Sequence, residues 1–75
     1  MNEEKLIRCF QAVFPDLSPE QIRTASAETL QEWDSVAMIN LLNLISEEFQ
    51  IETDWDRVDE LTSYQAVSAM VASRA

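Results

Sequence analysis

The 75-residue chain has a formal net charge of -9 and contains no histidine, no glycine and a single cysteine. This composition excludes the Ser-His-Asp and Cys-His arrangements of nucleophilic catalysis, clustered zinc sites, internal disulfides and glycine-rich phosphate loops. The length suits a single domain, residues 1–75, whose small core leaves little room for an enclosed active site, so we expect a non-catalytic protein without a metal site.

The first predicted helix follows Asn2, whose side chain can cap it, and ends before Pro15. Its apolar residues repeat at the spacing of one buried helical stripe and are Leu6, Phe10, Val13 and Phe14. The lone Cys9 is expected to fill core space on this helix rather than to act as a reactive thiol.

A short second helix is predicted at the sequence LSPEQI. Ser18 can cap it, Pro19 suits its first position, and Gln21 can return a hydrogen bond to the cap. The segment 24–32 has no sustained apolar stripe and predicts a loop held to the core by Leu30. Loops of this length in small domains are often functional.

The strongest helical pattern runs from Ser35 to about Phe49, with Asp34 as its cap. Trp33 before the cap and Met38 inside the helix can form a hydrophobic staple. Because Asp34 takes the capping position, Ser35 becomes the first helical residue. Its hydroxyl is then not needed for capping and is expected to face solvent.

Two sides of this helix are distinguished by their residue types. A stripe that we expect to face water consists of Val36, Asn40, Asn43 and Glu47. The expected core set is Ile39, Leu42, Ile45 and Phe49, flanked by Met38, Leu41 and Leu44. Val36 is an apolar residue on the polar stripe, next to Ser35, and is therefore a candidate partner contact.

The last third of the chain predicts a short turn and a final helix. The turn spans about Trp55–Glu60 and can be capped by Asp54, and the helix opens with a capping box of Thr62 and Gln65. The apolar side of this helix consists of Leu61, Tyr64, Val67, Met70 and Val71. The expected fold class is all-α, a bundle of three main helices plus one or two short helices.

Negative charge is concentrated in residues 31–60. This segment holds nine acids and one basic residue, the acids being Glu32, Asp34, Glu47, Glu48, Glu52, Asp54, Asp56, Asp59 and Glu60. We expect a partner with a basic surface and no nucleic acid, although such acids can also serve solubility alone. The acidic amino terminus and the lack of a long apolar run favour a cytoplasmic protein without a membrane partner.

The whole constellation resembles the acyl carrier protein family. The resemblance rests on Asp34-Ser35-Val36, the EEFQI segment at residues 47–51 and the LTSYQAV segment at residues 61–67, and it covers nearly the whole chain. It implies an acyl-carrier-protein-like bundle in which a phosphopantetheinyl transferase attaches 4'-phosphopantetheine from coenzyme A to Ser35. The thiol of that arm would hold cargo as a thioester.

The resemblance also implies roles for the residues around Ser35. Asp34 is expected to cap the helix, to help bind the transferase, or both. The expected partner-binding residues are Trp33, Val36, Asn40, Asn43 and Glu47. As large aromatic residues, Trp33 and Trp55 are also expected to fill the small core or cover its rim. The expected partners are acyl-loading, ketosynthase-type or acyltransferase-type enzymes, and the protein is expected to be a stand-alone monomer.

The chain departs from the family pattern at several positions. Val36 stands in place of the usual leucine, and Ala37 and Asn40 occupy early helix positions where many fatty-acid carriers have acids. These changes favour dedicated partners in a specialised fatty-acid or polyketide-like pathway. An aminoacyl or peptidyl carrier of a nonribosomal peptide-type pathway, and an unmodified acidic helical adaptor, remain the alternatives.

Overall fold

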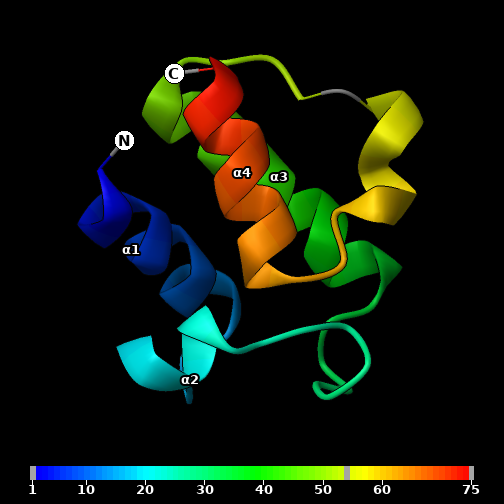
Figure 1. Cartoon of the computed structure of the whole chain (residues 1–75). Coiled ribbons are helices and arrows are strands. Elements are labelled where there is room, and N and C mark those ends of the chain that lie inside the picture. The colour runs from blue at the N-terminus through cyan, green and yellow to red at the C-terminus, as the bar shows by residue number, and fades with distance from the viewer. Residues whose placement is uncertain (1, 54, 75) are drawn as a thin grey trace.

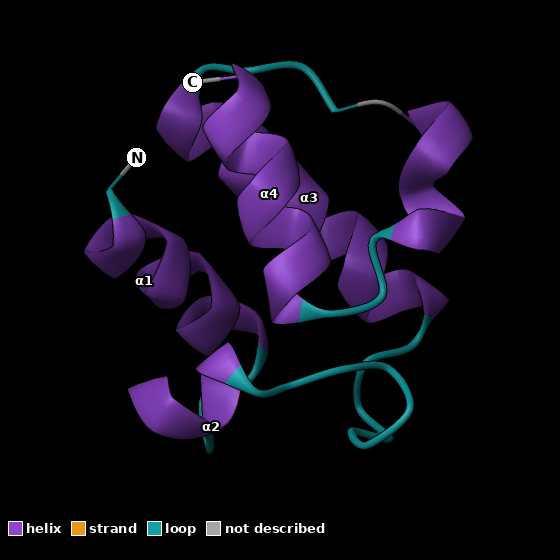
Figure 2. Cartoon of the chain, viewed as in Figure 1, coloured by secondary structure: helices purple, strands orange, loops and turns teal. Residues whose placement is uncertain are grey.

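The structure is a computed structural model that describes residues 2–53 and 55–74. Its elements in chain order are α1 (Glu3–Val13), α2 (Pro19–Arg23), α3 (Ser35–Phe49), the 3-10 helix η1 (Trp55–Glu60) and α4 (Tyr64–Arg74). The described residues form helices and loops without a strand, as Figures 1 and 2 show. This confirms the predicted all-α class, whereas the predicted cap Asp54 lies outside the described residues.

The first two helices begin at the predicted caps. The Lys5 N–H donates to Asn2 Oδ1 at 3.1 Å. At α2 the Gln21 N–H donates to Ser18 Oγ at 3.2 Å and the Ser18 N–H donates to Gln21 Oε1 at 2.9 Å, which completes the capping box. An ion pair of 2.8 Å between Arg23 and Glu3 joins α2 to α1, but its partners are half exposed and contribute little stability.

One hydrophobic core joins the elements. Helix α1 packs against α3 and α2, and α2 contacts α4. The fully buried large side chains are Leu6, Phe10, Ile22, Leu41, Leu42, Ile45, Val67 and Val71. Each such side chain contributes about 1.5–3 kcal/mol relative to an exposed one. Phe10 lies at the aromatic centre, with the Tyr64 ring at 5.2 Å and the Trp33 ring at 5.6 Å between centroids.

The inward side of α3 differs from the predicted one. Met38, Leu41, Leu42 and Ile45 are buried, whereas Ile39 is 49% exposed and Phe49 is only partly buried. The expectation that Ile39 belongs to the core is therefore wrong. The helix is apolar on most of its circumference, so that periodicity alone did not determine which side faces α1 and the core.

The start of α4 also differs from the prediction. The Ala66 N–H donates to Ser63 Oγ at 3.1 Å, so Ser63 caps α4 and the predicted capping box of Thr62 and Gln65 does not form. An isolated antiparallel bridge between Ser26 and Ser63 accounts for this difference. Its hydrogen bond from the Ala27 N–H to the Thr62 carbonyl, 2.8 Å long, keeps Thr62 outside the helix.

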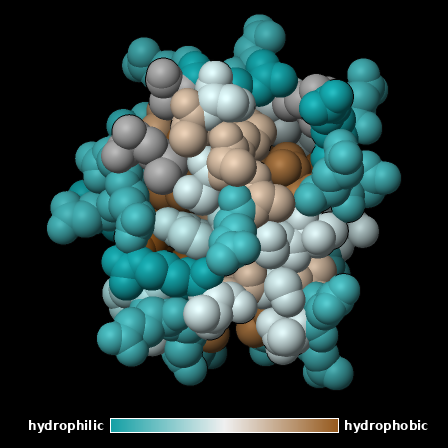
Figure 3. All heavy atoms as spheres, viewed as in Figure 1, coloured by the Kyte–Doolittle hydropathy of each residue, from teal (hydrophilic) through white to brown (hydrophobic). Residues whose placement is uncertain are grey.

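Helix α4 has an apolar side in the core and a weakly apolar outer side. Val67 and Val71 are buried, Ala66 and Met70 are partly buried, and Ala69 is exposed. Figure 3 shows the consequence as a pale-to-brown strip along α4 that is bordered by hydrophilic residues. The strip lies on small side chains, so it offers a partner little apolar area.

Candidate functional site

The candidate site is built on the amino end of α3. The Asp34 backbone is extended, and its Oδ1 accepts the Ala37 N–H at 2.9 Å. Ser35 is therefore the first helical residue, as predicted. Its side chain is exposed and makes no hydrogen bond among the residues that the structure describes. The hydroxyl is thus accessible and is not used to hold the fold together.

Trp33 fixes the position of this helix start. Its ring lies 5.6 Å from Phe10 and 5.7 Å from Phe14 between centroids, and its side chain is only 4% exposed. The contacts attach the segment before Ser35 to α1. The expectation that Trp33 contributes to a partner-binding surface therefore needs correction, because a core side chain presents almost no area to a partner.

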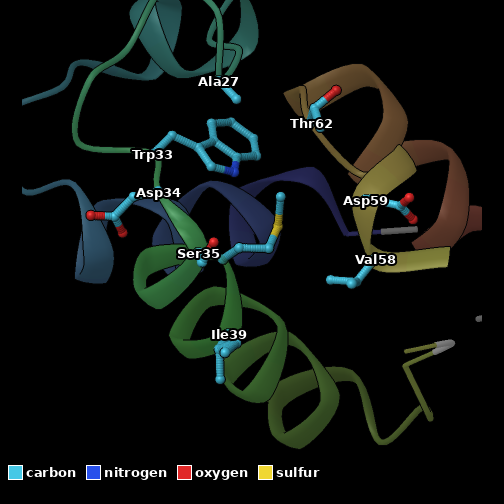
Figure 4. Close-up of a pocket in the computed structure, with 9 residues that line it drawn as sticks. Ala27, Trp33, Asp34, Ser35, Ile39, Val58, Asp59 and Thr62 are labelled. Carbon is cyan, nitrogen blue, oxygen red and sulfur yellow. The ribbon is translucent and has the colours of Figure 1, made fainter. Parts of the chain in front are cut away.

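A cavity of about 400 Å³ lies beside Ser35. It is formed by the segment before α3, the first turns of α3, η1 and the segment before α4 (Figure 4). The residues that line it are mainly apolar and are Ala27, Trp33, Asp34, Ser35, Met38, Ile39, Val58, Asp59 and Thr62. None of these lining residues is basic. A group attached to Ser35 would meet this cavity immediately.

The predicted polar stripe of α3 is exposed over its whole length. Val36 is 67% exposed, and Asn40, Asn43 and Glu47 are exposed as well. The latter three also line a shallow groove of about 520 Å³, together with Ala12 and Val13 of α1. Val36, next to Ser35, and Ile39, one turn after Ser35, form an exposed apolar pair. Four of the five predicted partner-binding residues are therefore accessible.

Cys9 is unsuited to act as a nucleophile. Its side chain is 4% exposed. Burial raises the pKa of the thiol above its ordinary value, the negative charge of Glu48 raises it further, and Lys5 partly opposes these effects. The thiol therefore stays protonated at neutral pH, and the thiolate needed for reactivity does not form.

Several residues of the cavity were not identified from the sequence as site residues. Ile39 was assigned to the core, although its position one turn after Ser35 places it on the same side of the helix. Ala27, Val58 and Thr62 belong to three separate segments. No local pattern indicates that these segments meet, because tertiary packing brings them together.

Comparisons with protein-family models, with curated proteins and with solved structures give no match for this chain. The described residues contain no helix with the length and apolar character required to cross a membrane. Residues 2–53 and 55–74 also contain no cluster of three or more His, Cys, Asp or Glu side chains that could hold a metal ion.

The surroundings of Ser35 contain no histidine that could act as a base. A serine hydroxyl needs a neighbouring base to become a nucleophile, and the chain contains no histidine. The acids beside Ser35 are Asp34, which is used as a helix cap, and Asp59 in the cavity wall. Ser35 is therefore an accessible hydroxyl beside two carboxylates, one of which serves as the helix cap.

Proposed function

We propose that this chain is a carrier domain in which Ser35 holds 4'-phosphopantetheine and the arm holds an acyl intermediate as a thioester. The observation on which the proposal rests is the exposed Ser35 hydroxyl at the start of α3, with the capping role taken by Asp34. The resemblance to acyl carrier proteins, and a helical fold consistent with the bundle of that family, support the same function.

The local electrostatics suit a phosphodiester at this position. A phosphate on Ser35 Oγ would lie at the amino end of a 15-residue helix, where free N–H groups and the helix dipole favour an anion. The Asp34 carboxylate, which would repel it, is bound to the Ala37 N–H and is turned away from Val58 and Asp59 in Figure 4. The arm itself supplies a thiol for thioester chemistry, and the chain supplies attachment and recognition.

Asp34 has two roles in this proposal. Its Oδ1 holds the first turn of α3 through the Ala37 N–H, which keeps the Ser35 side chain outside the helix cap. Its exposed charge can also attract the basic residues and metal ion of a phosphopantetheinyl transferase. A neutral residue that still caps the helix separates the two roles.

The exposed side of α3 favours dedicated pathway enzymes. Val36, Asn40 and Asn43 carry no charge, and Glu47 is the first acid of this stripe. Enzymes that recognise a carrier through arginines near the modified serine would find no acidic partner on these early turns. We therefore place the domain in a specialised fatty-acid or polyketide-like pathway, served by its own loading and ketosynthase- or acyltransferase-type enzymes.

The attachment is tested by intact mass. The purified chain is incubated with coenzyme A and a broad-specificity phosphopantetheinyl transferase, and the mass is expected to rise by one phosphopantetheine group. Ser35→Ala should abolish the gain, and Ser18→Ala is the matched control because Ser18 also lies at a helix start but caps it. A wild-type chain that remains unmodified would contradict the carrier function and favour the unmodified adaptor.

The class of partner is tested with loaded protein. The acyl form is offered to general fatty-acid elongation enzymes, and slow or absent elongation is expected, with an ordinary fatty-acid carrier as the positive control. Efficient elongation would overturn the assignment to a specialised pathway. The mass of the thioester species on protein from its native host distinguishes acyl cargo from aminoacyl or peptidyl cargo.

A further inference from the structure

The indole nitrogen of Trp33 is a buried donor without an acceptor. Nε1 has almost no exposed surface and no hydrogen-bond partner among the described residues. A buried donor that has lost its bond to water and gained none in return is unfavourable, and native structures contain few of them. Because Trp33 forms part of the wall of the cavity beside Ser35, a ligand of that cavity is the natural source of an acceptor.

The orientation of the ring supports this explanation. The rings of Phe10 and Phe14 contact Trp33 at centroid distances of 5.6 and 5.7 Å, so that α1 restrains the indole. In Figure 4 the nitrogen-bearing edge of the indole is turned toward Ser35. Nε1 has almost no exposed surface, so a bond from it to a group in the cavity requires a change in the cavity wall. Met38, which is unbranched and has several rotatable bonds, is the lining side chain best able to provide it.

The attachment point determines which part of a tethered group meets the cavity. Ser35 itself lines the cavity, so the segment of the arm closest to the phosphate is held there at high effective concentration. In 4'-phosphopantetheine this proximal segment carries a pair of geminal methyl groups, then a hydroxyl-bearing carbon, then an amide carbonyl. The apolar side chains of Ile39 and Val58 suit the methyl groups, and the Trp33 N–H suits the carbonyl oxygen.

We propose that the Trp33 indole N–H donates a hydrogen bond to the amide carbonyl nearest the phosphate of the arm on Ser35, while the geminal methyl groups pack in the adjoining cavity. This inference rests on the proposed function and assigns Trp33 as a positioning residue. The bond holds the proximal arm against the domain and leaves the thiol end mobile. A partner enzyme then receives the arm from a defined starting position.

The test compares the two indole N–H signals of the chain by nuclear magnetic resonance before and after attachment of the arm. Trp55 is 46% exposed and does not line the cavity, so it serves as the internal control. Trp33→Phe and Trp55→Phe assign the signals, but the decisive measurement uses the wild-type chain. We expect the Trp33 N–H signal to move downfield by several times the shift of Trp55, with contacts between the Trp33 ring and the arm's geminal methyl protons.

The outcomes separate this inference from the function on which it rests. If the chain gains no mass on incubation with the transferase and coenzyme A, the carrier function and the hydrogen bond from Trp33 are both contradicted. A chain that gains one phosphopantetheine group but shows an unchanged Trp33 signal keeps the carrier function and overturns the hydrogen bond. A Trp33 signal that moves only after an acyl group has been loaded also overturns the proposal, because the donor then binds cargo rather than the arm.

Discussion

The starts of α2 and α3 both contain a serine, but the two hydroxyls have different roles. Ser18 Oγ accepts the Gln21 N–H at 3.2 Å and is part of a capping box. At α3 the acceptor is Asp34 Oδ1, at 2.9 Å from the Ala37 nitrogen, and Ser35 stands one position further along the chain. The difference teaches that an acid directly before a serine can take over the cap and leave the hydroxyl accessible.

The same substitution at the two helix starts gives the largest contrast. Ser35→Ala is expected to remove the phosphopantetheine mass gain completely, because the oxygen that forms the phosphodiester bond is lost. Its effect on the free energy of unfolding should stay within about 0.5 kcal/mol, as for a surface residue outside a cap. Intact mass and urea denaturation measure the two effects.

Ser18→Ala is the control and should show the reverse pattern. Modification is retained, while loss of the cap lowers the free energy of unfolding by about 1 kcal/mol. The contrast between the helix starts fails if Ser18→Ala also blocks modification, or if Ser35→Ala destabilises the chain as much as Ser18→Ala does.

The side of α3 that is buried determines the direction in which the residues at its start, including Ser35, face. Leu42 is fully buried and Ile39 is 49% exposed. Leu42→Ala should lower the free energy of unfolding by about 2–5 kcal/mol, a large part of the stability of a small domain. Ile39→Ala should cost less than about 1 kcal/mol, because about half of the Ile39 surface already contacts solvent. Thermal unfolding measures both losses of stability. Similar losses in the two variants would mean that α3 is rotated about its axis relative to the orientation described above.

Replacing the α3 cap separates its structural role from its charge. Asp34→Ala should destabilise the chain by about 1 kcal/mol, whereas Asp34→Asn should cost little because asparagine caps equally well. Both variants lose the charge, so both should be modified more slowly if the transferase recognises the carboxylate. Initial rates of mass gain provide the measurement. An Asp34→Asn variant modified at the wild-type rate would assign Asp34 to capping alone.

The smallest expected effect is a loss of stability at high pH that does not depend on either helix start. Burial is the main cause that raises the pKa of Cys9 above its ordinary value of 9.0, with Glu48 adding to it. The unfolded chain therefore releases this proton at lower pH than the folded chain does. The corresponding stability is fully present below pH 9.0 and is lost as the pH rises through the folded value.

Burial also raises the pKa of Tyr64 from its ordinary value of 10.0, with Glu3 as the second cause, so a further loss is expected above that pH. Thermal unfolding across alkaline pH should show a weaker decline in Cys9→Ala than in the wild type. In Ser18→Ala and Ser35→Ala the stability should decline with rising pH at the same rate as in the wild type. If stability declined with rising pH at a different rate in either serine variant, the corresponding helix start would be shown to affect the titration of Cys9 or Tyr64.

The caps were predictable from the sequence because they are local interactions. Asn2, the pair of Ser18 and Gln21, and Asp34 each bind a backbone group three residues away, so a short stretch of sequence contains both partners. The same locality predicted the exposure of Ser35, since its position relative to the cap depends on one neighbour. The bounds of α1, α2 and α3 follow from these signals together with Pro15 and Pro19.

Long-range packing decided the features that the sequence did not predict correctly. The bridge between Ser26 and Ser63 moved the cap of α4 from Thr62 to Ser63, and nothing near residue 63 indicates that bridge. Trp33, for which the sequence left both a core and a partner-facing position open, lies in the core because the rings of Phe10 in α1 and Phe14 directly after α1 pack against its ring. A tryptophan beside a candidate site is compatible with a buried or an exposed position until its neighbours are known.

The sequence by itself determined α1, α2 and α3 with their caps and the accessible hydroxyl at position 35, because each depends on residues within about one turn. Only the tertiary structure decided that Ile39 faces outward and that Val58 lines a cavity beside Ser35. The reason is that α3 is apolar on several sides, so its orientation follows from the shapes of α1, η1 and α4 and not from its own pattern.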